Sequence, residues 1–240
     1  MRLTHTANSK TFYESCRFLA RYLLRVFCRV HLIILEAPPG EGPCILASNH
    51  ISHFEPALIG GFFPRLLDWV AMEELFHHPC SAWFLKKLHV IPVNRLGNNP
   101  LTNRQGLRTI LDRLKQGRAV GIFPEGGIRS QEGSILQGAR MKPGVIFLSE
   151  LAQAPVIPCV VLGTDRLYLA RNWLRRPHLW MIVGKSIQPP LRCDKDLKSA
   201  RLHFEKNLSI AFLKLQEELC ERFELTHEDL PQSAQERRSS

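Results

Sequence analysis

Short apolar runs recur along this chain, each bounded by proline, glycine or polar residues. Most of them contain valine or isoleucine, and they are too short for core helices, so they are typical of buried strands. This pattern predicts strands at residues 44–48, 67–72, 90–93, 119–123, 155–162 and 179–183.

Between these runs, apolar residues recur three or four positions apart, which is the spacing of one face of a helix. The spacing predicts helices at residues 57–63, 81–88, 102–116, 144–153 and 194–225. Because strands alternate with helices, we expect an α/β fold with a single-layer, mixed and largely parallel sheet flanked by helices.

The N-terminal part of the chain predicts a further helix, over residues 11–31. Four arginines recur there at every fourth position, and leucine and phenylalanine fill much of the remainder: Arg17, Arg21, Arg25 and Arg29. We interpret it as an interfacial amphipathic helix with its apolar side in lipid and its arginines at the headgroups. The alternative is a helix packed on the domain with a solvated basic face.

No membrane-spanning segment is expected, because the most apolar stretch, residues 18–35, is interrupted by arginines. We therefore expect a peripheral protein at the cytoplasmic face of a membrane. The predicted organisation is a membrane-associating segment at residues 1–37, one α/β domain at 38–225 and a polar tail at 226–240.

Composition narrows the range of partners and compartments. The net charge of +10 indicates an anionic partner, such as nucleic acid, anionic lipid, an acidic carrier protein or a polyanionic cofactor. Nucleic acid ranks last, because no basic stripe interleaved with aromatic residues is present. The cysteines number 7 and include no C-x-x-C pair, which indicates a reducing compartment rather than a disulfide framework.

The first candidate for chemistry is the segment at residues 49–56, Asn-His-Ile-Ser-His-Phe-Glu-Pro, between a predicted strand and a predicted helix. If His50 lies in the turn and Glu55 at the mouth of the helix, the carboxylate can bond one imidazole nitrogen. The other nitrogen is then left basic, ready to accept a proton from an alcohol. Pro56 favours a helix that begins here.

Two other interpretations of this segment remain open. Residues 52–55 match a capping box, in which Glu55 would only satisfy backbone donors. His50 and His53 also raise the question of a metal, but no companion ligands occur at a usual spacing, and we expect none.

The second candidate segment, at residues 122–130, follows another predicted strand and contains Pro-Glu-Gly-Gly and an arginine. Glycines allow backbone amides to approach an anion, and Arg129 can supply a bidentate clamp. Glu125 is an acceptor suited to a polyol hydroxyl. Taken alone, the segment equally fits a tight turn with a surface arginine.

With these segments, the chain resembles the glycerophospholipid acyltransferase family, which includes the 1-acylglycerol-3-phosphate acyltransferases. The family's four ordered blocks correspond here to residues 49–55, 91–95, 123–130 and 156–160, followed by a Lys-Pro-Gly step at Lys142. The resemblance covers about residues 40–190, and its first and third blocks are the specific ones.

The resemblance implies a role for each matching residue. His50 would be the catalytic base and Glu55 would replace the family's usual aspartate, one methylene shorter. The remaining matches would bind substrate, with both arginines on the acceptor's phosphate: Asn49, Arg95, Phe123, Pro124, Glu125, Gly126, Arg129 and Lys142. Asn94 and Gly127 depart from residues common in the family, acidic and threonine respectively, which bears on the identity of the acceptor.

The sequence therefore predicts an acyltransferase that moves a fatty acyl group from acyl-CoA or acyl carrier protein to a lysophospholipid hydroxyl. The expected reaction converts 1-acylglycerol-3-phosphate to phosphatidic acid, without a metal or redox cofactor. The alternatives are a lipid acceptor without phosphate, such as a glycolipid, amino lipid or hydroxylated pigment, and a catalytically silent lipid-binding homologue.

Overall fold

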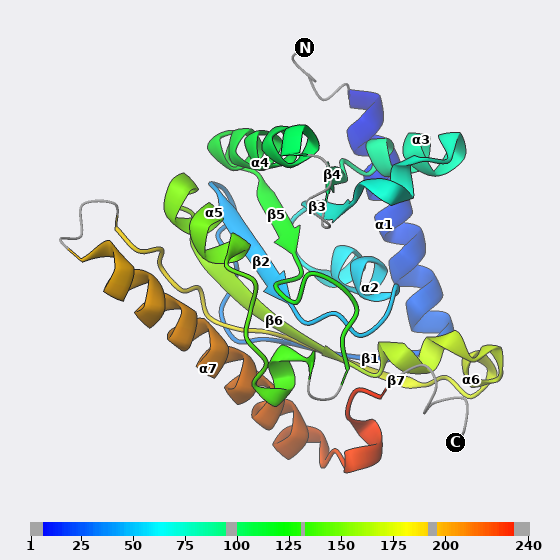
Figure 1. The fold of residues 1–240 in the computed structure, drawn as a ribbon. Helices are drawn as coiled ribbons and strands as arrows, with labels where there is room; N and C mark the ends of the chain where they lie inside the picture. The colour runs from blue at the N-terminus through cyan, green and yellow to red at the C-terminus, as the bar shows by residue number, and fades with distance from the viewer. Residues whose placement is uncertain (1–6, 95–99, 131–132, 192–195, 233–240) are drawn as a thin grey trace.

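The computed structural model describes residues 7–94, 100–130, 133–191 and 196–232. Within these ranges the strands form one sheet, in the order β1-β7-β6-β2-β5-β3-β4 (Figure 1). The strands are β1 (Arg29–Ile34), β2 (Cys44–Ser48), β3 (Leu67–Met72), β4 (Ile91–Val93), β5 (Ala119–Ile122), β6 (Val156–Leu162) and β7 (His178–Val183).

All neighbouring strands are parallel except β6 and β7, which are antiparallel. The predicted mixed, largely parallel sheet is thus confirmed. The helices are α1 (Ala7–Phe27), α2 (Glu55–Phe62), α3 (Pro79–Lys87), α4 (Pro100–Lys115), α5 (Gly144–Ala152), α6 (Ala170–Leu174) and α7 (Leu197–Phe223).

Short 3₁₀ helices connect several of these elements. They are η1 (Glu73–Phe76), η3 (Ile135–Gln137), η4 (Thr164–Tyr168) and η5 (His227–Asp229). The sequence pattern did not predict them, nor did it predict α6, because one turn of helix carries too little hydrophobic periodicity to be recognised.

Helices cover both faces of the sheet, and each interface has its own core. Apolar side chains of α4, α5 and α7 pack on one face, including Leu114, Ile146 and Phe212. Those of α1 and α2, including Leu24, Leu58 and Phe62, pack on the other. Figure 1 shows α7 in orange along one side of the sheet and α1 in blue along the other. Because both faces of the sheet are buried, the strands are apolar along nearly their whole length.

The predicted helix over residues 11–31 is wrong at its C-terminal end. The helix ends at Phe27, and residues 29–34 form the edge strand β1, which pairs in parallel with β7. The four-residue arginine spacing continues by chance into Arg29, which lies in the strand. The predicted boundary after residue 37 therefore falls beyond a strand that belongs to the common sheet.

The predicted orientation of α1 also needs correction. Arg17 donates to the carbonyl of Phe63, and Arg21 Nε donates to the carbonyl of Gly61 at 2.8 Å, so both arginines hold α1 against the end of α2. The apolar residues of α1 are exposed as expected, and Arg25 is exposed among them: Phe18, Leu19, Tyr22, Leu23, Val26 and Phe27. None of the described helices is long and apolar enough to span a membrane.

Candidate active site

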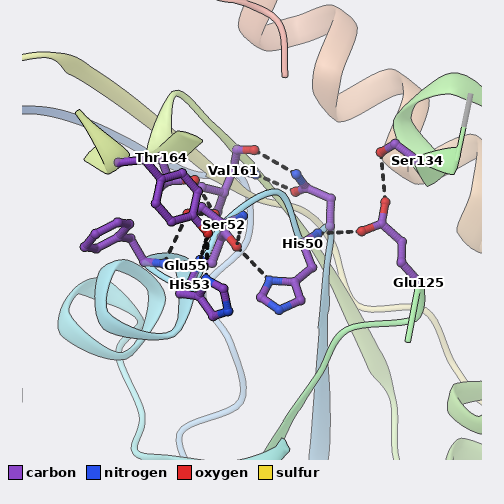
Figure 2. A network of polar contacts seen from close by, with 11 residues as sticks. His50, Ser52, His53, Glu55, Glu125, Ser134, Val161 and Thr164 are labelled. Carbon is purple, nitrogen blue, oxygen red and sulfur yellow. Dashed lines mark hydrogen bonds and ion pairs between the residues drawn. The ribbon is translucent and has the colours of Figure 1, made fainter. Parts of the chain in front are cut away.

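Three neighbouring parallel strands end at the same edge of the sheet and bring the candidate residues together. β2 lies between β5 and β6, and the loops that follow these strands carry His50, Glu125 and Thr164 respectively. In open α/β sheets this edge, beyond the carboxyl ends of the strands, is where ligands bind. Figure 2 shows the three residues converging there.

His50 and Glu55 meet as the sequence predicted. Nδ1 of His50 lies 2.7 Å from Oε2 of Glu55, with the histidine in the turn and the glutamate as the first residue of α2. The Glu55 side chain is fully buried, whereas that of His50 is 16% exposed. Because an ionised carboxylate only accepts, Nδ1 carries the proton and Nε2 is the basic nitrogen.

Several other donors hold the Glu55 carboxylate in place. Oε2 accepts the backbone N–H of Ser52 at 2.9 Å, and Oε1 accepts the hydroxyls of Ser52 and Thr164 (Figure 2). The alternative interpretation as a cap is thus partly right, since Glu55 does bond the Ser52 amide. It does so while also bonding His50, and the longer side chain reaches the imidazole without difficulty.

The second motif clamps the backbone of His50 on both sides. The Glu125 carboxylate accepts the His50 N–H at 2.6 Å, and the carbonyl of His50 accepts the backbone N–H of Arg129 at 2.7 Å. The second motif thereby fixes the turn that carries the His50 imidazole, although the two motifs lie far apart in the sequence.

Glu125 is itself engaged by the protein. It is buried, and its other oxygen accepts the Ser134 hydroxyl at 2.8 Å and the Ile135 amide at 2.9 Å. Burial raises the pKa of the Glu125 carboxyl, and these hydrogen bonds with that of His50 lower it in part. A direct role in binding an acceptor hydroxyl stays a prediction.

Asn49 is also occupied within the fold. Its side-chain amide donates to the Val161 carbonyl and accepts the Val161 amide, both at 2.8 Å, and it is fully buried. This pair of bonds ties the end of β2 to β6, one residue before the imidazole. Its predicted contact with substrate remains untested.

Two stacked aromatic rings, those of Phe123 and Trp69, support one face of the His50 imidazole. The His50 ring lies 4.0 Å from that of Phe123 with an interplanar angle of 14°, and Phe123 in turn stacks on Trp69 at 5.1 Å. Trp69 lies flat on β5 because Gly121 has no side chain, since a Cβ there would come within 2.6 Å of the indole. Phe123 therefore contacts the candidate base directly.

A cavity of about 840 Å³ opens beside His50 and runs between α1, α2, α3 and β3. Most of its lining is apolar, with contributions from Ala57, Gly60, Val70, Phe84 and Leu88. His50, His53 and Arg129 also line it. A cavity of this size and character suits a long hydrocarbon chain with its polar end at the imidazole.

The remaining predicted residues lie around this site. Arg129 has an exposed side chain, and the aliphatic part of Lys142 packs close to Gly126, which has φ of +69°. The Lys142 amide donates to the Pro124 carbonyl at 2.8 Å. Arg95 lies outside the described residues.

The sequence did not reveal two contacts near the His50–Glu55 pair. Thr164 reaches Glu55 from the loop after β6, and the Tyr168 hydroxyl lies 2.6 Å from Nδ1 of His53. Neither belongs to a motif that could have indicated it. In the part of the chain that the structure describes, no group of 3 or more His, Cys, Asp and Glu is placed to hold a metal ion.

Comparison with known families settles the class of protein. Residues 29–162 match the family described as Acyltransferase, which is more than half of the chain. The chain belongs to the acyltransferase family. The match contains β1, β2, β5 and β6 and hence the His50–Glu55 pair and the second motif.

Two curated relatives bear the same name, 1-acyl-sn-glycerol-3-phosphate acyltransferase. The one from Bacillus subtilis is 24% identical over 73% of this chain and 82% of its own length. The one from Pseudomonas aeruginosa is 31% identical over 70% of this chain and 63% of its own length. The crystal structure of the LPA acyltransferase PlsC from Thermotoga maritima has the same fold, with a TM-score of 0.62 and 22% identity, over 89% of this chain and 84% of that one.

Proposed function

We propose that this acyltransferase moves a fatty acyl group from a thioester, acyl-CoA or acyl carrier protein, to the free hydroxyl of 1-acylglycerol-3-phosphate. The product is phosphatidic acid. The observation that carries the proposal is the His50–Glu55 contact of 2.7 Å at the polar end of a large apolar cavity. The names of the two curated relatives support the choice of acceptor.

The reaction needs only groups that this chain supplies. Nε2 of His50 takes the hydroxyl proton while the alcohol oxygen attacks the thioester carbonyl carbon. Glu55 holds the imidazole and stabilises the imidazolium that forms. When the C–S bond breaks, the imidazolium returns the proton to the thiolate leaving group, so His50 is regenerated without a covalent acyl-enzyme.

The apolar cavity is the proposed site of the donor's acyl chain. Its walls expose apolar groups that match a hydrocarbon, and each buried methylene contributes roughly 0.8 kcal/mol of binding. The thioester carbonyl would then lie at the His50 end, which positions the reacting atoms next to the base.

The acceptor's phosphate is assigned to Arg129 together with Arg95. Arg129 lines the same cavity as His50, and its exposed guanidinium is accessible to an incoming anion. A planar guanidinium can bind a phosphate through two parallel hydrogen bonds. The other residues that the sequence predicted for substrate binding are proposed to shape the acceptor site: Asn49, Phe123, Pro124, Glu125, Gly126 and Lys142.

The proposed working position is the cytoplasmic surface of an anionic membrane. Phe18 of α1 is 72% exposed and Tyr22 is 58% exposed, which are large apolar side chains on one face of a helix. Leu174 in α6 is 88% exposed beside the exposed Arg175 and Arg176. Trp180, by contrast, is buried in β7 and does not belong to this surface.

Release of free thiol from palmitoyl-CoA, measured with a panel of acceptors, tests the function. Rapid release with 1-acylglycerol-3-phosphate and little with monoacylglycerol supports the proposal. Equal rates with both acceptors would favour an acceptor without phosphate. No release with any acceptor or with palmitoyl carrier protein would indicate a silent lipid-binding protein.

A further inference from the structure

A second, smaller cavity lies at the ends of β1 and β7, away from the candidate active site. Its volume is about 260 Å³, and it shares no lining residue with the first cavity. Its lining comes from distant parts of the chain: His31, Arg166, His178, Trp180, Phe223, Leu225 and Asp229. In Figure 1 the red C-terminal segment after α7 turns back toward β7 at this place.

Two donors in this lining are buried without an acceptor among the described residues. Trp180 is 4% exposed, and its Nε1–H has no hydrogen-bond partner there. The same holds for Nε of Arg166, whose guanidinium lies 5.5 Å over the Trp180 ring. Because leaving a buried donor unpaired is costly, such groups indicate an absent acceptor.

The hydrogen bonds of the two histidines point to a third donor. Nη1 of Arg29 lies 3.2 Å from Nε2 of His178, and a guanidinium can only donate, so Nε2 accepts. Neutral His178 then donates from Nδ1 to Nε2 of His31, at 2.9 Å. The proton of His31 is therefore on its Nδ1. Burial is the main cause that lowers the pKa of both histidines; His178 and Arg29 add to this at His31, and Arg29 and Arg166 add to it at His178, which favours these neutral forms.

The acceptors in the lining are already occupied. Asp229 accepts from Nη2 of Arg166 at 2.7 Å with one oxygen and from the amide and hydroxyl of Thr226 at 3.0 Å with the other. Within the lining Arg166 and Asp229 balance each other in charge, and Arg29, which bonds His178 from outside the lining, adds positive charge beside it. The cavity thus offers donors and positive charge in a volume that suits a small ligand.

We propose that this cavity, which we name the β1–β7 pocket, is a second ligand site that binds a small oxyanion such as a phosphate group. Nε1 of Trp180 and Nε of Arg166 donate to it, and the apolar Phe223 and Leu225 close its other side. The ligand is a free ion or the headgroup of a lipid, since both present the same oxygens.

The β1–β7 pocket and the candidate active site are linked by one short segment of the chain. Arg166 belongs to η4, whose first residue, Thr164, donates to Glu55. Gly163, just before it, packs so closely on β7 that a Cβ would clash with the carbonyl oxygen of His178. The pocket and the catalytic carboxylate are therefore connected through one short segment.

The test is a titration of the ¹⁵N-labelled full chain with sodium phosphate at constant ionic strength, followed through the indole N–H signals. The chain has 4 tryptophans, and Trp180→Phe assigns the relevant signal. Trp69 lines the first cavity and reports on binding there. We expect a saturable shift of the Trp180 signal that persists in Arg129→Gln.

Variants distinguish the pocket from general anion binding. Arg166→Gln should weaken phosphate binding about tenfold or more, because it removes a charged donor. Arg171→Gln, at an exposed arginine nearby, should leave it unchanged. Asp229→Asn should strengthen it, because a negative charge is removed. If Arg166→Gln does not fold, Arg166→Lys keeps the charge without the Nε donor and should still weaken binding.

Dihexanoyl phosphatidic acid in place of phosphate identifies the source of the oxyanion. A Trp180 shift that saturates with both ligands indicates a free-ion site, and one that saturates only with the short-chain lipid indicates a headgroup site. The proposal is overturned if neither ligand shifts the Trp180 signal, if only the Trp69 signal responds, or if Arg166→Gln binds as wild type does.

Discussion

Glu55 Oε2 lies 2.7 Å from Nδ1 of His50, although the two residues are five positions apart and α2 begins only at the second of them. On one continuous helix these side chains would point in directions about 140° apart. The turn before α2 is what lets them meet. Ser52 and Thr164 then fix the carboxylate, so that the imidazole has one orientation.

Changing Glu55 tests whether its charge matters or only its hydrogen bonds. Glu55→Gln should lower kcat by about 10²–10⁴, because an amide does not stabilise the imidazolium and disturbs the tautomer of His50. Glu55→Asp should retain an intermediate rate, since the charge remains but is withdrawn by one methylene. Thiol release under saturating acceptor measures both. Wild-type rates in both variants would leave Glu55 only the role of bonding the Ser52 amide.

Arg129→Ala should raise KM for the phosphorylated acceptor and leave KM for palmitoyl-CoA nearly unchanged. Loss of a charge-assisted contact costs about 1.5–3 kcal/mol, or roughly ten- to a hundredfold in binding. Arg129→Lys should recover only part of this, because an ammonium cannot bind bidentately. Arg140→Ala, at an exposed arginine paired with Glu205, is the matched control. An equal effect on both substrates would mean that Arg129 acts on the fold rather than on phosphate.

Gly60 offers a way to shorten the proposed acyl site. It lines the large cavity from α2, where a Cβ would meet Trp69 Nε1 at 3.8 Å and the Tyr13 hydroxyl at 3.9 Å. Gly60→Ala therefore fits, and its activity should resemble wild type. Gly60→Leu should narrow the cavity at α2 and reduce palmitoyl transfer about tenfold or more relative to octanoyl transfer, because several methylenes lose their contacts. The ratio of the two rates is the measurement, and an unchanged ratio would place the chain elsewhere.

The outward face of α1 should hold the protein on a bilayer. Replacing Phe18, Leu19 and Tyr22 together by Ser should sharply reduce co-flotation with anionic vesicles, since each buried side chain of this size contributes about 1.5–3 kcal/mol. The melting temperature should change little, because these side chains are exposed. Leu202→Ser, at an exposed leucine of α7, controls for general loss of apolar surface. Undiminished flotation of the triple variant would assign membrane contact to another surface.

Much of the fold could be predicted because buried strands and amphipathic helices follow simple periods. The strands at 44–48 and 67–72 were predicted with their observed bounds. The strand at 29–34 was missed because its residues continue the arginine spacing of α1, and only pairing with β7 makes them extended. A local sequence pattern does not show that a segment will pair with a strand so distant in the sequence.

In the candidate site, too, contacts within one motif could be predicted and contacts between distant segments could not. The contact of His50 with Glu55 followed from a short motif, as did the bond between Glu55 and Ser52. The contributions of Thr164 and Asn49 depend on β6 lying beside β2, which is a property of the sheet and not of any motif. The outward apolar face of α1 was expected, but the inward contacts of Arg17 and Arg21 were not, because a helical period does not say which polar side chains face the protein.

The turnover of His50→Ala tests the account most directly, with His53→Ala as the matched control. Both histidines line the large cavity, but only His50 contacts Glu55, whereas His53 pairs with Tyr168. If His50 is the base, His50→Ala, folded and with the melting temperature of the control, releases thiol from palmitoyl-CoA and 1-acylglycerol-3-phosphate about 10²–10⁴ times more slowly than wild type. His53→Ala should stay within about threefold of wild type. A folded His50→Ala protein that turns over as fast as His53→Ala would contradict the proposed mechanism.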